Sequence, residues 1–401
     1  GDGPTSSATS AVTSSLDTSA VVKAQGDAAL TYRAGLGTNY VPTSSMLQPG
    51  QWLMLDAYCF LKYTLNSWAN ASSHLTNCQN QWTYIKSLAR SSGAASGLLC
   101  LDGNTAVVET DAHFRPILHT MECARLLQFS GDATAATLAA DMVSYCQTWA
   151  KNGIDKMPRA TRTYNGWDAN SQTAWQASHA YSVGDLVRPT STNGRSYRCY
   201  TAGTSSGSEP TWPTSTGGTV TDGSVVWKET TRANSHFAHI YSVGASTLSA
   251  ASTSYLVNKE LVVAAALAML MSEQSATDFY TGGSYNSTAQ AIIDANIDTA
   301  CSAFTNSDGS MPYSDGTGMA SGLTQNDTLY GAFCTSTLAT VYKIGLTSDW
   351  QVSPAMSKAL DWLESGNYST EPLACEHRTG LGSGISPGGD IAFRFAAYTV
   401  L

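Results

Sequence analysis

Two short stretches of the sequence gather side chains that could move protons. The stretch "VVETDAHFRPILH" carries Asp111, His113 and Arg115, with Glu109 just before them. A carboxylate can orient an imidazole, and a guanidinium can neutralise the carboxylate of a uronic acid or a phosphate. The stretch therefore suits acid–base chemistry beside an anionic sugar. The structural alternative is that its acidic residues complement the N-terminus of a helix.

The second stretch, "RANSHFAHIYS", holds His236, His239 and Tyr241 behind an arginine and an asparagine. These are the residue types that β-elimination at a uronic acid requires: a cation or amide for the carboxylate, a base for the C5 proton, and a tyrosine for the leaving oxygen. The alternative is that the histidines anchor a loop. If both stretches rim one cleft, the catalytic set comprises Asp111, His113, Arg115, His236, His239 and Tyr241.

Glycoside hydrolysis would instead use a pair of carboxylates. Further candidates for that pair are Glu260 at the start of a very apolar segment, Asp327 in "GLTQNDTLYGAF", and Glu376 in "CEHRTGLGSGISPGGD". Asp327 also suits an N-terminal helix cap.

No cofactor is expected. The glycine-rich stretch after Glu376 lacks the lysine and the preceding strand of a phosphate loop. His236 and His239 have no recognisable third metal ligand, so no metal site is expected.

Helical periodicity dominates the elements that must position these residues. Helices are predicted near 77–91, 116–129, 134–151, 254–274, 286–305, 326–345 and 353–365, with Pro116 as a first-turn residue. They follow one another as antiparallel pairs, which predicts a mainly α fold, an α/α toroid that is complete or incomplete. At the level of the fold this resembles the α/α-barrel polysaccharide lyases and glycoside hydrolases.

Between 170 and 231 the period changes from 3.6 to 2, and short strands alternate with Gly and Pro turns. An inserted β module in a loop of the helical domain explains the change. The predicted organisation is a Ser/Thr-rich segment over 1–45, a helical domain over 46–169 and 232–401, and the module over 170–231.

The module resembles the small chitin/cellulose-binding modules of carbohydrate-binding families 5 and 12, and most closely the variants found in bacteriophage tail proteins. The resemblance rests on the order Trp175, Tyr181, Gly184-Asp185, Val187, Gly194, Tyr197, Ala202-Gly203, Glu209-Pro210, Trp212 and Trp227. It implies that exposed aromatic rings stack on sugars, for which Tyr200, Trp212 and Trp227 are the candidates. The alternative is that the tryptophans form the core of a small domain.

Composition excludes some partners. Only 13% of the residues are charged, the formal net charge is −9, and lysines and arginines form no run, which argues against nucleic acid. The longest apolar run, 261–271, is too short to cross a bilayer, so no membrane insertion is expected. The nine cysteines include no CxxC pair and are interpreted as buried thiols of a protein made in a reducing bacterial cytoplasm.

The main hypothesis is a phage or prophage tail-associated protein, in the virion or extracellular, that binds bacterial surface glycan and depolymerises it as a lyase or glycoside hydrolase. Other virion proteins are possible partners. Two alternatives stay open: a non-catalytic virion adhesin or structural protein, and a bacterial polysaccharide-processing enzyme unrelated to phage.

Overall fold

The computed structural model describes residues 18–42, 48–100, 106–164, 172–252, 256–305, 311, 328–347 and 355–357. About half of these residues lie in helices, and the strands form a few small sheets. The predicted predominance of helices is therefore confirmed in this part of the chain, while the toroid stays a prediction. The chain divides into two compact units. Unit 1 comprises Gly1–Ala89, Leu101–Gly103 and His119–Cys146, and unit 2 comprises Arg90–Cys100, Asn104–Leu118 and Gln147–Leu401.

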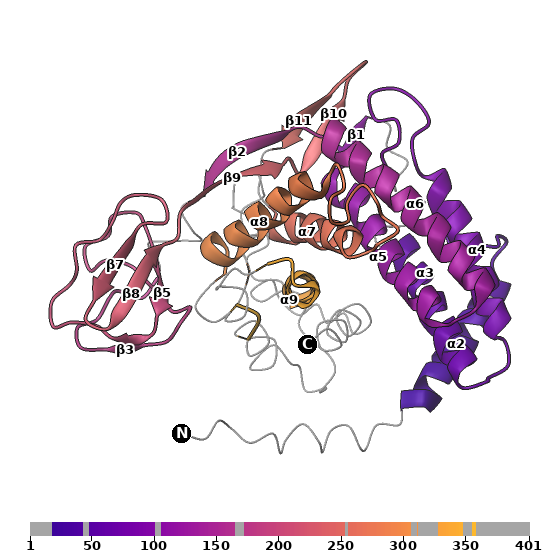
Figure 1. Ribbon diagram of the computed structural model, residues 1–401, viewed down its shortest axis with the longest axis horizontal. Helices are drawn as coiled ribbons and strands as arrows, with labels where there is room; N and C mark the ends of the chain where they lie inside the picture. Colours follow the sequence, from indigo (N-terminus) through magenta and orange to yellow (C-terminus); the bar gives the residue numbers. More distant parts are fainter. Residues whose placement is uncertain are drawn as a thin grey trace. The chain divides into compact units, whose positions relative to one another are not determined.

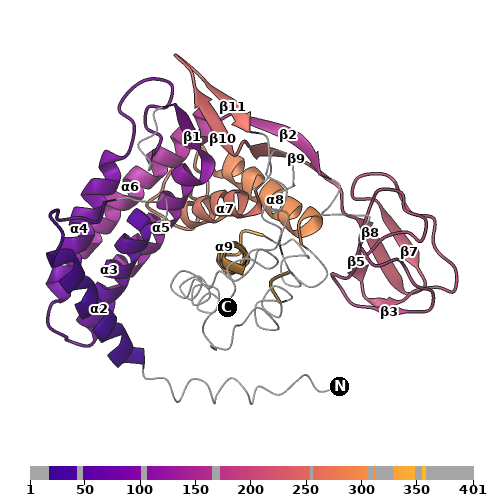
Figure 2. The ribbon, with the colours of Figure 1, turned by 180° about the vertical axis from the view of Figure 1, so that it is seen from behind.

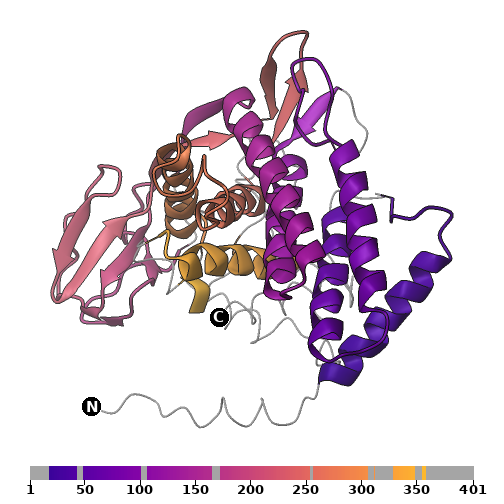
Figure 3. The same cartoon turned by 45° about the vertical axis from the view of Figure 1, so that its right-hand side comes forward.

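Unit 1 is helical. Its elements are α2 (Thr18–Ala34), α3 (Gln48–Leu65), α4 (Ala71–Ser87), the second half of α5 (Thr110–Phe129) and the first part of α6 (Ala133–Lys156). Helix α3 packs against α4 and against α2 (Figure 3). The buried face of α4 carries Leu75, Cys78, Trp82 and Ile85, which recur at the spacing of one helix face. Helix α2 lies within the Ser/Thr-rich segment predicted over 1–45.

Helix α5 begins earlier than predicted. Pro116 lies inside the helix instead of in its first turn, because the helix already starts at Thr110. The proline lacks the N–H that would bond to the carbonyl of Ala112. The preceding turn is held instead by contacts of Thr110 and Asp111, described below. Pro116 therefore correctly indicated a helix, but the helix starts about one and a half turns before the predicted position.

Unit 2 is built around α7 (Val257–Met271). Every residue of this helix is buried, and it packs against α8 (Asn286–Ala303) and α9 (Thr328–Ile344) (Figure 2). A helix that is apolar on all sides must be covered on all sides. Its first turn departs from this rule, because Asn258, Lys259 and Glu260 are polar and equally buried.

Two small sheets flank these helices in unit 2. In the first, β1 (Val107–Glu109), β10 (Ile240–Val243) and β11 (Leu248–Ser252) pair antiparallel in the order β1-β10-β11. The second is a ribbon of β2 (Arg159–Tyr164) and β9 (Arg232–Phe237), visible in Figure 1. Strands were expected only between 170 and 231, and these five segments lie outside that range.

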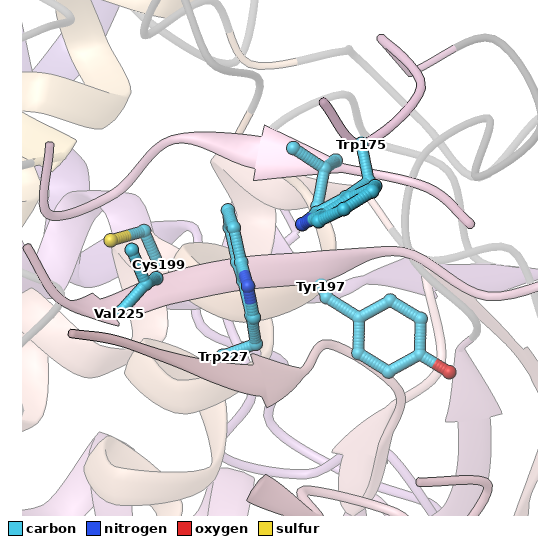
Figure 4. Packing of buried hydrophobic residues seen from close by; sticks show 6 residues of the cluster. Trp175, Tyr197, Cys199, Val225 and Trp227 are labelled. Carbon is cyan, nitrogen blue, oxygen red and sulfur yellow. The ribbon is translucent and has the colours of Figure 1, made fainter. Parts of the chain in front are cut away.

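The β module contains a four-stranded antiparallel sheet in the order β4-β5-β8-β7 and a two-stranded sheet of β3 and β6. Its strands are β3 (Ala180–Tyr181), β4 (Leu186–Val187), β5 (Tyr197–Thr201), β6 (Gly203–Thr204), β7 (Thr219–Asp222) and β8 (Val225–Glu229). The core consists of the six buried residues Trp175, Val187, Tyr197, Cys199, Val225 and Trp227 (Figure 4). Large rings thus supply most of the apolar volume in a module of this size.

One carboxylate organises this core. Asp222 Oδ2 accepts hydrogen bonds from the indole N–H groups of Trp175 (2.7 Å) and Trp227 (3.0 Å). Its other oxygen, Oδ1, accepts from the backbone and hydroxyl of Ser206 at 2.9 and 2.6 Å. Both indoles are therefore satisfied although they are buried, as a stable polar contact in a core requires.

The two ends of the module meet at the ribbon. In β2 and β9 the register runs from Arg159 opposite Phe237 to Tyr164 opposite Arg232, so the chain leaves and returns at neighbouring positions. One further contact ties the module to α8. Arg198 on β5 donates to the carbonyls of Thr305 (2.5 Å) and Ser302 (3.4 Å), at the C-terminal end of that helix.

Replacing residues 165–231 with Asn-Gly should leave the helices folded, because a two-residue turn can join Tyr164 to Arg232 within the existing ribbon. The lost hydrogen bonds from Arg198 should cost about 1–3 kcal/mol of unfolding free energy. Circular dichroism and thermal melting of the deletion variant measure both effects. Disappearance of the cooperative helical transition would contradict an independently folding module.

Candidate active site

A buried lysine occupies the first turn of α7. The Lys259 side chain is 6% exposed, and its Nζ lies 2.8 Å from Glu109 Oε2 and 2.9 Å from Asp111 Oδ1. A cation at this end of a helix faces the positive pole of the macrodipole, which is unfavourable. The two carboxylates offset both that repulsion and the loss of hydration. We call Glu109, Asp111, Arg115, His239 and Lys259 the ion cluster.

The strand-to-helix junction from β1 to α5 supplies the acids of the ion cluster. Glu109 ends β1, and Asp111 lies in the first turn of α5. One turn later Arg115 places a guanidinium nitrogen 3.3 Å from Asp111 Oδ2. The Arg115 side chain is only 2% exposed, so water is largely excluded from this ion pair. The first sequence stretch is thus folded into a charged corner.

The second sequence stretch meets the first at this corner. Thr110 donates from its backbone N–H to the carbonyl of His239 (3.2 Å) and from its hydroxyl to the carbonyl of Ala238 (2.5 Å). His239 Nε2 lies 3.7 Å from Glu109 Oε2, which is an ion-pair distance but longer than a direct hydrogen bond. Glu109 and His239 are the more exposed members of the cluster, at 21% and 15% of their side chains.

The cations hold both acids in their ionised form. The neighbouring His239, together with Lys259, lowers the pKa of Glu109 below its ordinary value and outweighs partial burial. For Asp111 burial is the largest influence and by itself raises the pKa, but the charges of Lys259 and Arg115 overcome it and the net direction is downward. Both acids are therefore ionised at neutral pH.

A second buried pair lies close by in the same unit. His236 Nδ1 lies 3.0 Å from Asn296 Oδ1 and 3.5 Å from Glu260 Oε2, and its Nε2 lies 3.0 Å from Thr299 Oγ1. Within the described part of the chain, Glu260 Oε2 is buried without a hydrogen-bond partner. A buried carboxylate oxygen in that state is costly and marks a place where structure alone does not explain the residue.

His113 lies in the core instead of at the ion cluster. Its Nδ1 accepts from the backbone N–H of Leu99 (3.1 Å) and its Nε2 lies 3.0 Å from the carbonyl of Trp149, so the ring is neutral with the proton on Nε2. Burial lowers the pKa of His113 to about 4. A Cβ at Gly153 would come within 2.7 Å of Nε2, so this glycine makes room for the ring. These contacts favour a structural role.

Tyr241 is held in a similar way. Its hydroxyl accepts from the backbone N–H of Ala238 (2.7 Å) and donates to the carbonyl of Pro158 (2.8 Å). The side chain is fully buried, and burial raises its pKa above the ordinary value. The hydroxyl thus fixes the turn before β10 and has no spare proton directed at a substrate.

The structure therefore gathers Asp111, Arg115 and His239 in one place, sets His236 beside Glu260, and assigns His113 and Tyr241 to backbone contacts. Asp327 and Glu376 lie outside the described residues. The sequence-based set omitted Lys259 and Glu109, although both bear directly on the cluster. The signal for Lys259 was the charged pair in "VNKELVVAAALAMLM", immediately before an apolar run that had to be buried.

The aromatic candidates of the β module lie in two different environments. Trp227 is fully buried, and Trp212 packs at 4.3 Å on the ring of Tyr197 on the core side of the sheet. Tyr200 is 44% exposed and shares the outer face with Lys228, whose ammonium lies 5.9 Å from the ring. Tyr200 lies where the register between β5 and β8 shifts, whereas Trp212 packs against the buried cluster. The three rings do not form one flat platform.

Several further features concern the described residues only. None of their His, Cys, Asp and Glu side chains form a group of three or more that could hold a metal ion. The eight cysteines among them are thiols that form no disulfide with one another. No helix in this part of the chain has both the length and the apolarity needed to cross a membrane.

Comparisons with known proteins do not identify the function of these residues. No protein-family model matches the chain, and no curated protein matches it. A solved structure described as "Glycosyl hydrolase family 88 from Bacteroides vulgatus" is similar at 11% identity, over 86% of this chain and 73% of that one, with a TM-score of 0.39. A TM-score this low does not establish a common fold, so the case for a function comes from the residues themselves.

The burial of His113 predicts a pH dependence of stability. Its folded pKa of about 4 lies below the ordinary value of 6.5, so between these values the unfolded chain binds the proton more tightly. The stabilisation is complete above pH 6.5 and is lost as the pH falls toward 4. Denaturant unfolding across this range should show the loss, and His113→Gln should be less stable at pH 7 but flatter in its pH response.

His179, which is exposed on the β module, provides the control. His179→Gln should keep the full pH response of the unmodified chain. An unchanged slope in His113→Gln would contradict the assignment of a buried neutral imidazole.

Proposed function

We propose that this chain processes polysaccharide, with the ion cluster as its acid–base site. In the wider setting that we propose, the protein is associated with a phage or prophage tail and cleaves bacterial surface glycan. The observation that carries the catalytic part is the ion cluster at the start of α7, in which Lys259 joins two ionised acids while Glu109 and His239 keep an exposed edge.

Stability alone is a poor explanation for this cluster. Desolvating charged groups costs several kcal/mol per ion, and well-packed apolar residues often serve a core as well or better. Here the charge of Lys259 is also repelled by the positive end of the helix macrodipole. The neighbouring Glu260 Oε2 is buried and has no hydrogen-bond partner among the described residues. Ionisable groups that are buried, charge-compensated and partly open to solvent are typical of functional sites.

The proposed chemistry assigns different tasks to the exposed pair. Glu109 stays ionised because of His239 and Lys259, so it suits the role of a base or of an electrostatic partner. The His239 imidazole lies beside Glu109, with Nε2 3.7 Å from Oε2, so the ring suits the role of the acid. Together they would protonate the glycosidic oxygen from His239 and take up a proton, from water or from the sugar ring, at Glu109.

The charges of the ion cluster bear on the substrate. Lys259 and Arg115 are balanced by Glu109 and Asp111, so these four groups together give no net attraction for a uronate. This balance gives no preference for elimination over hydrolysis. The products distinguish the two reactions, since elimination leaves an unsaturated uronate and hydrolysis leaves only a new reducing end.

Support for the phage setting comes from the sequence of the β module and from the low content of charged residues, 13% of the chain. The second candidate function is a non-catalytic virion adhesin. It is favoured by the deep burial of Arg115 and Asp111, whose mutual pairing would also serve a purely structural corner.

Glu109→Gln and His239→Ala should each reduce depolymerisation of bacterial capsule or lipopolysaccharide by about 10²-fold or more, because each removes one half of the acid–base pair. Reducing-end release and unsaturated-uronate absorbance measure the rate and identify the reaction. Circular dichroism should show both variants folded.

A matched control exists in the ion pair of Lys151 with Asp278, which has the same chemistry at 2.8 Å but a more exposed lysine. Lys151→Met should keep full activity, whereas Lys259→Met should lose it. Full activity in His239→Ala with the fold intact would remove the proposed acid–base role. Absence of any product from a panel of bacterial polysaccharides would favour the adhesin.

We propose further that the β module contributes one stacking ring to glycan binding, Tyr200. It is the exposed aromatic on the outer face of the sheet, whereas Trp227 belongs to the core. One exposed ring with a lysine beside it supports weak stacking on a sugar and not a broad platform.

Tyr200→Ala should weaken retention on insoluble polysaccharide with an unchanged melting temperature. Trp227→Ala should instead destabilise the module by about 3–5 kcal/mol, because it leaves a cavity in a small core. Affinity electrophoresis and thermal melting separate the two effects. Unchanged retention in Tyr200→Ala would exclude stacking by this ring.

A further inference from the structure

Unit 1 contains a cavity of about 480 Å³ between α2 and α4, lined by Leu30, Thr31, Arg33, Ala34, Asn39, Asn70, Ser73, Asn77 and Asn80. This volume falls within the ~300–1,000 Å³ that small-molecule sites occupy. The lining is unusual because four of its members are asparagines. We call this space the amide pocket.

The asparagines line the pocket as a stripe of one helix and its entry. Asn70, Ser73, Asn77 and Asn80 recur every three or four residues, which places them on one side of α4. The other side of the helix carries the apolar residues of the unit 1 core. A row of amides at helical spacing is therefore turned toward the cavity.

The fold leaves hydrogen-bonding capacity unused on the amide side chains of Asn70 and Asn77. Asn70 precedes α4 with a left-handed backbone (φ 75°), yet its side chain makes no capping hydrogen bond. An asparagine at this position ordinarily caps the helix with its side chain. Within the described residues, Asn77 makes one long hydrogen bond, to Asp56 Oδ1 at 3.4 Å.

Arg33 forms a fixed wall of the pocket. Its guanidinium donates to Asp56 Oδ2 (2.5 Å) and Gln81 Oε1 (3.3 Å) and lies 5.2 Å from the ring of Trp52. The side chain is only 5% exposed, and in the described part of the chain its Nε has no hydrogen-bond partner. A buried donor in that state costs free energy.

The groups behind this wall hold it rigid. Asp56 also binds His74 Nδ1 at 2.9 Å, so the carboxylate is held by Arg33 and His74 in addition to the long contact with Asn77. Gln81 donates to the carbonyl of Val41 (3.2 Å) and accepts from its N–H (2.9 Å), which pins the loop that carries Asn39. A site whose lining is fixed in advance loses less entropy when a ligand binds.

We infer that the amide pocket binds a neutral, hydroxyl-rich saccharide segment. Amide side chains donate and accept at once, as sugar hydroxyls do. Arg33 is the charged member of the lining and is balanced by Asp56, so the pocket has no net attraction for an anion. Leu30 and Ala34 offer a small apolar surface for the C–H face of a sugar ring. This site is independent of the ion cluster and does not depend on the proposed catalytic role.

The binding test uses the full chain carrying His239→Ala, so that cleavage does not consume the probe. Neutral hexasaccharides of glucose, galactose, mannose, rhamnose and N-acetylglucosamine are titrated calorimetrically. At least one should bind. Adding Asn70→Gly and Asn80→Leu should raise its Kd at least about tenfold, since two sets of hydrogen bonds are lost. Glycine tolerates the left-handed backbone at position 70.

Thr76→Ala with Thr83→Ala is the matched control, because both threonines are exposed on α4 and are not part of the pocket lining. The control should keep the parent affinity and melting temperature. Absence of binding by every hexasaccharide, or an unchanged Kd in the Asn70→Gly/Asn80→Leu variant, would overturn the inference. Binding that persists without any depolymerising activity in the parent chain would leave the pocket intact and reject the proposed catalysis alone.

Discussion

The burial of one ammonium group sets the conditions for the rest of unit 2. Lys259 enters the interior with α7 because the residues after it are apolar and must be covered. Two acids have to reach it, and both come from the junction of β1 and α5. That junction is held in turn by Thr110, which bonds to the carbonyls of Ala238 and His239. A single desolvated charge thus fixes the relation between three segments distant in sequence.

The sequence identified the helices well where burial determines them. A helix was predicted over 254–274, around the apolar run at 261–271, and α7 covers that run. Prediction failed where pairing decides the structure, as in β1, whose three residues become a strand only opposite β10. It also misplaced the start of α5, because Pro116 is a common first-turn residue but is tolerated inside this helix. Local patterns cannot reveal contacts that form between distant segments.

Similar limits explain the site residues. Both quoted stretches were rich in ionisable groups, and their proximity in space was a reasonable expectation. Sequence could not tell His239, which keeps an exposed edge, from His113, whose two nitrogens face backbone groups. That distinction depends on Leu99 and Trp149, which lie far along the chain from one another. Lys259 was passed over because a lone lysine is usually solvated, and only its burial makes it significant.

The buried polar groups of this chain differ in how completely they are satisfied. Asp222 in the β module saturates two indoles and a serine, and every contact serves the core. Within the described residues, Glu260 Oε2 and Arg33 Nε are buried without such partners. Asp222 shows that a buried carboxylate of this chain can have both oxygens satisfied by protein groups alone. The polar groups at the start of α7 and in the amide pocket are less completely satisfied, as is typical of groups with a role in binding or catalysis.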